Sequence, residues 1–293
     1  MRYSKTPADG LNIGGSTQIC ALIGDPVTHT LSPAIHNAAF RSLRMDHVYV
    51  AFRVRMSDLG AAVQGLKSLR VLGINVTMPH KLRVLSYLDR IDNTAREIGA
   101  VNTVIRSGTS LLGYNTDGQA AVTALSNLES LSGMRALVLG AGGAARAITY
   151  HLSKLTGSIV ILNRTRSKGM TLASKIRGWN GTLANAYGLN RTNFRREASH
   201  ADLLINTLPA RAFPRFAKIL LQERLVSRGM LVMDANYQPE SDFLAEARFA
   251  GAKAADGLEM LIEQAALSFR LWTGLDAPID IMRKAAVEAR PTQ

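Results

Sequence analysis

Lys81 is the side chain best placed for acid–base chemistry. It follows the run Asn75-Val76-Thr77-Met78-Pro79-His80, which begins as a predicted strand. Ligands of open α/β sheets bind outside the carboxyl ends of the strands, and a lysine partly withdrawn from water there can move a substrate proton near neutral pH. Asn75 and Thr77 alternate onto one face of the strand and predict a ligand-binding face. The competing interpretation is a solvated lysine in the first turn of a helix.

Asp117 is the candidate partner of Lys81 and lies in the run Gly113-Tyr114-Asn115-Thr116-Asp117-Gly118. Its carboxylate can accept a hydrogen bond from a substrate hydroxyl and hold the lysine in its charged or hydrogen-bonded state. The alternative role is an N-cap of the helix that follows. Asn102, at the start of another predicted strand, adds a polar side chain to the same site.

Thr30 and Ser32 place two hydroxyls beside a predicted helix N-terminus, which is a favourable position for a carboxylate. Ser32 stands before Pro33, a helix-start signature, so its hydroxyl is alternatively the N-cap. The two roles compete, because one oxygen cannot serve both fully.

Gln264 shares one predicted helix face with Met260, Leu267 and Leu271, at the i, i+4, i+7, i+11 spacing. An amide on an apolar stripe needs a partner, either in the protein or in a ligand. Gln264 is therefore a further candidate for the substrate site.

A glycine-rich loop follows the apolar run 136–139 and opens a helical run through Ile148 and Leu152. As strand, tight turn and helix, it offers backbone N–H groups at a helix N-terminus to the pyrophosphate of a dinucleotide. The candidate cofactor-binding residues in this loop are Gly140, Ala141, Gly142, Gly143 and Ala144.

The next predicted strand, 158–162, ends in Asn163-Arg164-Thr165-Arg166-Ser167-Lys168. Sites that prefer NAD usually place Asp or Glu here to accept from the ribose 2′-hydroxyl, and this run has no acid. It offers an amide, hydroxyls and three cations, which suit a 2′-phosphate because guanidinium groups bind phosphate through charge-assisted hydrogen bonds. The run therefore predicts NADP, with Asn163, Arg164, Thr165 and Lys168 as candidate contacts; the alternative is an ordinary solvated basic loop.

Composition limits the other classes of function. The chain has 293 residues, 47% hydrophobic content and a net charge of +13, with no apolar run long enough to span a bilayer and no apolar signal core. The positive charges are scattered with few aromatics among them, which argues against nucleic-acid binding. We expect a cytoplasmic protein that acts on a small molecule, as a monomer or homodimer. The single Cys20 excludes an intrachain disulfide, and we expect no metal, because the histidines lack ligand spacing.

Predicted strands and helices alternate along the chain, which indicates an α/β fold with two domains: an N-terminal, mostly parallel, open α/β substrate domain and a Rossmann-type dinucleotide-binding domain. We expect the substrate domain at 1–117, completed by C-terminal helices in 256–293, and the NADP-binding domain at 118–255. The expected strands include 18–24, 47–54, 72–77, 101–106, 110–114, 203–206 and 230–234; the expected helices include those starting at Ser32 and capped by Ser57, and 80–88, 93–98, 119–128, 242–250, 258–272 and 279–289.

The motifs together resemble the shikimate dehydrogenase family, from about Gln18 to Met282. The matching runs are Ile23–Pro26, His29–Asn37, Asn75–Lys81, Gly99–Thr103, Gly113–Gly118, Gly140–Arg146, Asn163–Thr165, Asp256-Gly257, Met260-Leu261 and Gln264-Ala265.

The resemblance implies an enzyme that reversibly reduces 3-dehydroshikimate to shikimate with NADPH, in the pathway to chorismate and the aromatic amino acids. Lys81 resembles the family's catalytic lysine, and Asp117 resembles its partner carboxylate. The resemblance also assigns the carboxylate-binding pair to Thr30 and Ser32, the ring hydroxyls to Thr77, Asn102, Asp117 and Gln264, a substrate contact to Tyr237, and cofactor contacts to Gly140–Ala144, Asn163–Lys168, Ala235 and Gly257.

Three departures from the family pattern accompany this resemblance. Thr30 stands where serine is usual and adds a methyl group beside the substrate. The run Asn206-Thr207-Leu208-Pro209 replaces a more usual Asn-Ala-Thr-Ser, and Ala235 replaces a bulkier apolar residue. Two alternatives therefore stay open: a quinate/shikimate dehydrogenase or paralogue with relaxed substrate or cofactor use, and a non-catalytic ligand-binding sensor.

Overall fold

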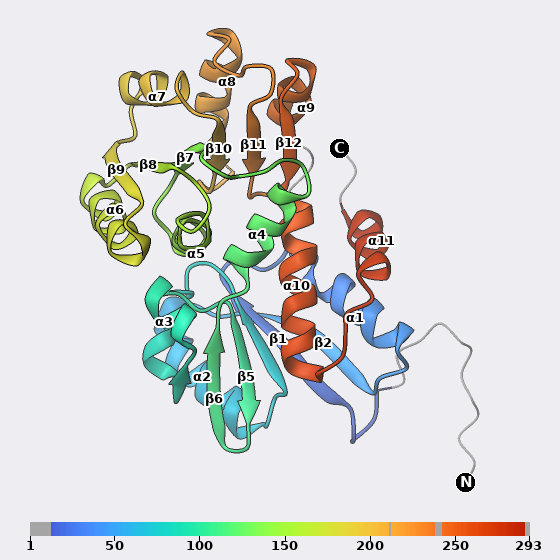
Figure 1. The fold of residues 1–293 in the computed structure, drawn as a ribbon. Helices are drawn as coiled ribbons and strands as arrows, with labels where there is room; N and C mark the ends of the chain where they lie inside the picture. Colours follow the sequence, from blue (N-terminus) through green and yellow to red (C-terminus); the bar gives the residue numbers. More distant parts are fainter. Residues whose placement is uncertain (1–12, 211, 238–241, 291–293) are drawn as a thin grey trace.

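The strands of the chain form two six-stranded sheets (Figure 1). The computed structural model describes residues 13–210, 212–237 and 242–290. The first sheet has the order β2-β1-β3-β5-β6-β4, with strands β1 (Gln18–Gly24), β2 (His47–Arg53), β3 (Gly73–Val76), β4 (Arg90–Ile91), β5 (Thr103–Ser107) and β6 (Ser110–Tyr114). The second has the order β12-β11-β10-β7-β8-β9, with strands β7 (Arg135–Leu139), β8 (Ser158–Asn163), β9 (Leu183–Gly188), β10 (Leu203–Asn206), β11 (Leu231–Asp234) and β12 (Lys253–Asp256).

Strand direction confirms the α/β class predicted from the alternation of elements. All neighbouring strands of the second sheet are parallel. In the first sheet β1 is parallel to β2 and β3, whereas β5 is antiparallel to β3 and β6. The central strands β7 and β10 are buried almost throughout, as expected for parallel strands with helices on both faces.

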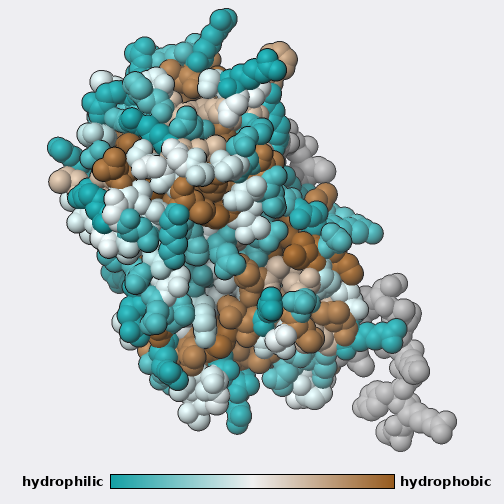
Figure 2. Space-filling view, viewed as in Figure 1, coloured by the Kyte–Doolittle hydropathy of each residue, from teal (hydrophilic) through white to brown (hydrophobic). Residues whose placement is uncertain are grey.

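Helices cover both sheets. They are α1 (Ser32–Ser42), α2 (Leu59–Ser68), α3 (Asn93–Ile98), α4 (Asp117–Ser126), α5 (Gly143–Leu152), α6 (Arg166–Asn180), α7 (Arg191–Ala198), α8 (Pro214–Gln222), α9 (Asp242–Phe249), α10 (Gly257–Thr273) and α11 (Ile279–Ala289). None of the described helices is long and apolar enough to cross a membrane. On the face shown in Figure 2, apolar residues form separate groups among hydrophilic ones.

The last two helices return to the first sheet. Helix α10 follows β12 of the second sheet and packs against α4, α1 and β5, and α11 packs against α1 (Figure 1). Phe40, Phe269 and Met282 meet in one buried cluster on this face of the first sheet. Residues 258–272 therefore do not pack only on the second sheet.

Several local predictions were wrong or incomplete. Leu31, not Ser32, is the N-cap of α1, and Asp58, not Ser57, precedes α2. Residues 80–88 contain turns and the 3₁₀ segment Val84–Tyr87 in place of a helix. Leu271 is exposed, so the buried face of α10 does not follow the predicted stripe to its end. Four elements were not predicted: β4, α6, β9 and α8.

Because Gly118 has no side chain, helix α4 packs with its backbone directly against the backbone of helix α5. A Cβ added to Gly118 would lie 2.1 Å from the carbonyl oxygen of Ala147. Gly118→Ala should therefore force the two helices apart and cost about 1–3 kcal/mol of unfolding free energy. The midpoint of urea unfolding measures this cost.

Gly178→Ala in α6 is the matched control, because nothing lies within 4 Å of a Cβ added there. This change should be neutral or stabilising, since alanine is favoured over glycine inside a helix. A Gly118→Ala protein as stable as the control would contradict the close approach of α4 and α5.

Candidate active site

Lys81 and Asp117 form an ion pair at the carboxyl-terminal side of the first sheet. The lysine Nζ lies 2.7 Å from the carboxylate Oδ2, and the two side chains are 19% and 5% exposed. The Lys81 carbonyl accepts from the backbone N–H of Val101, and the Asp117 N–H donates to Oδ1 of Asn115. Hydrogen bonds therefore hold the backbone of both Lys81 and Asp117 next to the ion pair.

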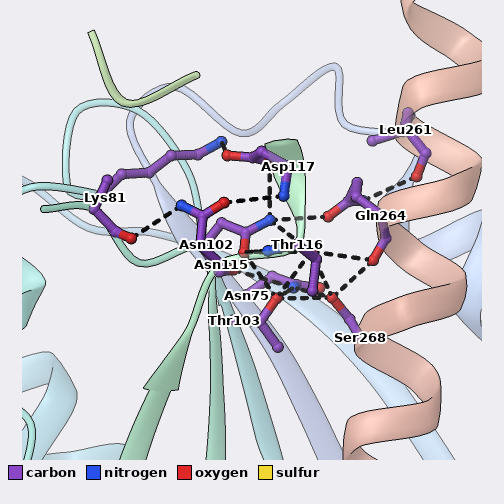
Figure 3. A network of polar contacts seen from close by, with 11 residues as sticks. Asn75, Lys81, Asn102, Thr103, Asn115, Thr116, Asp117, Leu261, Gln264 and Ser268 are labelled. Carbon is purple, nitrogen blue, oxygen red and sulfur yellow. Dashed lines mark hydrogen bonds and ion pairs between the residues drawn. The ribbon is translucent and has the colours of Figure 1, made fainter. Parts of the chain in front are cut away.

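Asn102 holds the other oxygen of the Asp117 carboxylate (Figure 3). Its Nδ2 donates to Oδ1 of Asp117 and to Oγ1 of Thr116, both at 2.9 Å, and lies 3.4 Å from Oε1 of Gln264. Its Oδ1 accepts from the Thr116 N–H at 2.8 Å. The amide is 2% exposed, so these bonds replace the water that it lost on folding.

Asn75 extends this network beneath Asn102. Its Nδ2 donates to the Asn102 carbonyl, to Oγ1 of Thr103 and to Oγ of Ser268, and its Oδ1 accepts from the hydroxyl of Tyr49 at 2.8 Å. Asn75 is 4% exposed. One lone pair of Oδ1 stays available, since the tyrosine uses only one.

Gln264 and Ser268 reach the network from α10, on the right of Figure 3. Gln264 donates through Nε2 to the Leu261 carbonyl, and Ser268 donates to the Gln264 carbonyl and contacts Oγ1 of Thr103 at 2.8 Å. The amide predicted on the apolar face of this helix therefore has both a backbone partner and a side-chain partner.

The hydroxyl residues predicted to bind a carboxylate lie together. Thr30 Oγ1 lies 3.2 Å from Ser32 Oγ and accepts from the Ser32 N–H. Burial raises the pKa of the Tyr237 hydroxyl, and a polar contact with Thr30 opposes that rise. Thr77 lies against Gly24, where an added Cβ would strike its methyl group.

The glycine-rich loop touches Lys81. Gly140 has a φ of +113°, which favours glycine, and Gly142 is the N-cap of α5 with open space around it. A Cβ on Gly143 would lie 3.1 Å from Cβ of Lys81. The predicted dinucleotide loop and the predicted catalytic lysine are therefore in contact, with Ala141 and Ala144 beside the turn.

The basic run lies at the start of α6, whose N-cap is Thr165. Arg164, Thr165 and Lys168 are exposed, and the Asn163 amide donates to the Thr165 carbonyl. Among the described residues no ion pair is formed by Arg164 or Lys168. A helix N-terminus with unneutralised cations fits an anionic group such as a phosphate.

Of the positions that depart from the family pattern, Thr207 lies beside the glycine-rich loop and Ala235 lies beside Gly257. Thr207 donates to the Leu139 carbonyl, and its Oγ1 would be 2.4 Å from a Cβ on Gly140. A Cβ on Gly257 would lie 2.7 Å from the carbonyl carbon of Ala235. Both glycines therefore admit a close approach of neighbouring residues. Gln238 and Pro239, which follow Tyr237, lie outside the described residues.

Four residues of the network were not predicted: Tyr49, Thr103, Thr116 and Ser268. Ser268 carried a usable signal, because it follows Gln264 by four residues and so shares its helix face. Within the described ranges, no group of acids, histidines and cysteines could hold a metal ion.

Family models match most of this chain. The shikimate dehydrogenase substrate binding domain matches residues 22–104, shikimate/quinate 5-dehydrogenase matches 122–211, and the shikimate 5′-dehydrogenase C-terminal domain matches 257–287. The shikimate dehydrogenase (NADP(+)) of Moorella thermoacetica is 42% identical over 282 residues, covering 95% of this chain and 96% of that protein. The chain belongs to the shikimate dehydrogenase family.

Solved members of the shikimate dehydrogenase family share the fold. A shikimate dehydrogenase crystallised with NADP+ is 36% identical, with a TM-score of 0.86 over 96% of this chain and 98% of that one. The Listeria monocytogenes shikimate 5-dehydrogenase, crystallised with shikimate and NAD, is 30% identical, with a TM-score of 0.83 over 93% and 97%. The comparison confirms the family resemblance carried by the sequence motifs.

His36 packs against Tyr49, and its contribution to the stability of the folded protein depends on pH. Its ring is fully buried and stacks on Tyr49, with centroids 4.4 Å apart, and burial lowers its pKa to about 3. Below about pH 6.5, His36 therefore binds a proton in the unfolded chain but stays neutral in the folded protein. This residue should remove about 1.4 kcal/mol of stability per pH unit as the pH falls from 6.5 toward 3.

His36→Phe keeps an aromatic ring but cannot titrate. The urea midpoint of the variant should fall less than that of the unmodified protein between pH 6.5 and 4.5. Parallel pH profiles for the two proteins would contradict a neutral, buried His36.

Proposed function

We propose that this protein is an NADP-dependent shikimate dehydrogenase, which reversibly reduces 3-dehydroshikimate to shikimate with NADPH in the pathway to chorismate. The observation that carries the proposal is the contact between Lys81 and Gly143, because it brings a partly buried acid–base pair against a dinucleotide loop. Family membership supports the same reaction. The protein would act in the cytoplasm, as a monomer or homodimer.

One domain would bind the substrate and the other would bind NADP. We assign the substrate domain to residues 1–117, completed by 256–293, and the NADP-binding domain to 118–255. The two separate sheets and the return of α10 and α11 to the first sheet support this division. The site then lies where the domains meet.

In the reducing direction Lys81 would donate its proton to the carbonyl oxygen of 3-dehydroshikimate, and in the oxidising direction it would accept that proton from the alcohol. Bound NADPH supplies the hydride. Asp117 would accept from a neighbouring ring hydroxyl and keep the lysine directed at the reacting oxygen. The 2.7 Å ion pair supports this arrangement.

The remaining polar residues would orient the substrate ring. Thr30 and Ser32 would donate to its carboxylate beside Tyr237. Their mutual contact and the start of α1 support a carboxylate at this point. The ring hydroxyls would meet four polar side chains: Asn75, Thr77, Asn102 and Gln264.

The cofactor would lie along the second sheet. Its pyrophosphate would bind at the loop 140–144 and the N-terminus of α5, and its 2′-phosphate at Asn163, Arg164, Thr165 and Lys168. Ala235 and Gly257 would border the nicotinamide. The open space at Gly142 and the unneutralised cations at the start of α6 support these positions.

Thr30 supports one alternative, a quinate/shikimate dehydrogenase or a related paralogue. Its extra methyl group lies at the proposed carboxylate site, where it can alter which ring is accepted. A non-catalytic sensor would not require an acid–base pair, so the Lys81–Asp117 ion pair disfavours that class of protein.

Initial rates with shikimate and quinate, each with NADP and NAD, test the proposal directly. Shikimate with NADP should give the highest kcat/KM. Faster turnover of quinate would favour the paralogue, and no turnover of either substrate would favour the sensor.

Arg164→Ala should weaken NADP and spare NAD, because the side chain would engage a phosphate that NAD lacks. Loss of one charge-assisted contact costs about 1.5–3 kcal/mol, roughly a 10- to 150-fold rise in the KM for NADP. The exposed Arg55→Ala is the control and should leave both constants unchanged. Equal losses for NADP and NAD in Arg164→Ala would refute the assignment.

A further inference from the structure

Tyr49 is a buried tyrosine that contacts the candidate site without belonging to its predicted residues. It lies on β2, is 1% exposed, and donates from its hydroxyl to Oδ1 of Asn75 at 2.8 Å. The hydroxyl also makes a polar contact with the side chain of Ser32. One phenol therefore reaches both ends of the proposed substrate site.

The surroundings hold the Tyr49 ring and main chain in place. The ring stacks on His36 with an interplanar angle of 11° and lies 6.0 Å from the ring of Trp272. The side-chain amide of Asn37 pairs with the tyrosine main chain, since Nδ2 donates to its carbonyl and Oδ1 accepts from its N–H. Stacking and pairing leave the hydroxyl little freedom to move away from Asn75.

The direction of the hydrogen bonds gives the hydroxyl a defined task. Nδ2 of Asn75 must face the Asn102 carbonyl, which can only accept, so Oδ1 faces Tyr49 and accepts a hydrogen bond from its hydroxyl. Thr103, which accepts from the same Nδ2, donates in turn to Oδ1 of Asn102. Asn102 then holds Asp117.

We propose that Tyr49 is a positioning residue for the dehydrogenase reaction: its hydroxyl fixes the amide of Asn75 so that the free lone pair of Oδ1 accepts from a ring hydroxyl of the substrate. The inference rests on the proposed function. It assigns to Tyr49 an effect on substrate binding that is separate from packing, because the ring supplies the packing and the hydroxyl supplies the orientation.

Tyr49→Phe isolates the hydroxyl, since the ring and its stacking stay. Without the donor, Oδ1 of Asn75 is left buried with an unmet bond, and the amide can tilt away from the substrate. The KM for shikimate should rise about fivefold or more, while the KM for NADP stays within about twofold. A KM does not depend on the amount of active protein, so partial misfolding of the variant leaves this measurement valid.

Tyr150→Phe is the matched control. Tyr150, on α5, is also buried, but its hydroxyl accepts from Lys154, which follows that helix, and lies outside the network. Both variants should keep their KM for NADP, and Tyr150→Phe should also keep its KM for shikimate.

The outcomes separate this inference from the proposed function. An active unmodified enzyme with an unchanged KM for shikimate in Tyr49→Phe would overturn the positioning role alone. Equal rises in both constants, or a fall confined to kcat, would show a merely structural role and overturn it as well. An unmodified protein that does not oxidise shikimate would refute the proposed function and this inference with it.

Discussion

The buried amide of Asn102 is the constraint on which the site depends. An amide that is 2% exposed must satisfy its donors and acceptor inside the protein. It does so by bonding to Thr116 and Asp117, where α4 begins, and by approaching Gln264 on α10. Elements far apart in the sequence are thereby held at one point, and the carboxylate that pairs with the lysine has a single position.

Close backbone contact brings the second sheet to that point. Gly118 lets α4 lie against Ala147 of α5, and Gly143 leaves room for the stem of Lys81. The N-terminus of helix α5 therefore lies against the stem of Lys81, with no side chain between them at Gly143. Proton transfer and hydride transfer need this proximity, because both occur at one carbon–oxygen bond of the substrate.

Most of the strands and helices could be predicted from the sequence, because buried strands and amphipathic helices have recognisable local patterns of apolar residues. It also indicated Lys81 and Asp117, since both follow recognisable turns at strand ends. It did not reveal Tyr49 or Thr103, because an apolar-looking tyrosine and a strand threonine acquire their roles only through partners distant in the sequence. The N-cap role considered for Ser32 was wrong because the sequence Ser-Pro is the same whether the serine is the N-cap or the first residue of the helix. Helix α6 was missed because its polar residues cover all but a narrow buried face.

The turnover number of Lys81→Ala with shikimate and NADP tests the central claim, that the lysine held by Asp117 moves the proton. General acid–base help is worth roughly 100- to 10,000-fold in rate, so the turnover number should fall by at least about a hundredfold. The KM for shikimate should change little, because other side chains hold the ring. Near-normal turnover, or a loss confined to substrate affinity, would contradict the account and reduce Lys81 to a binding residue.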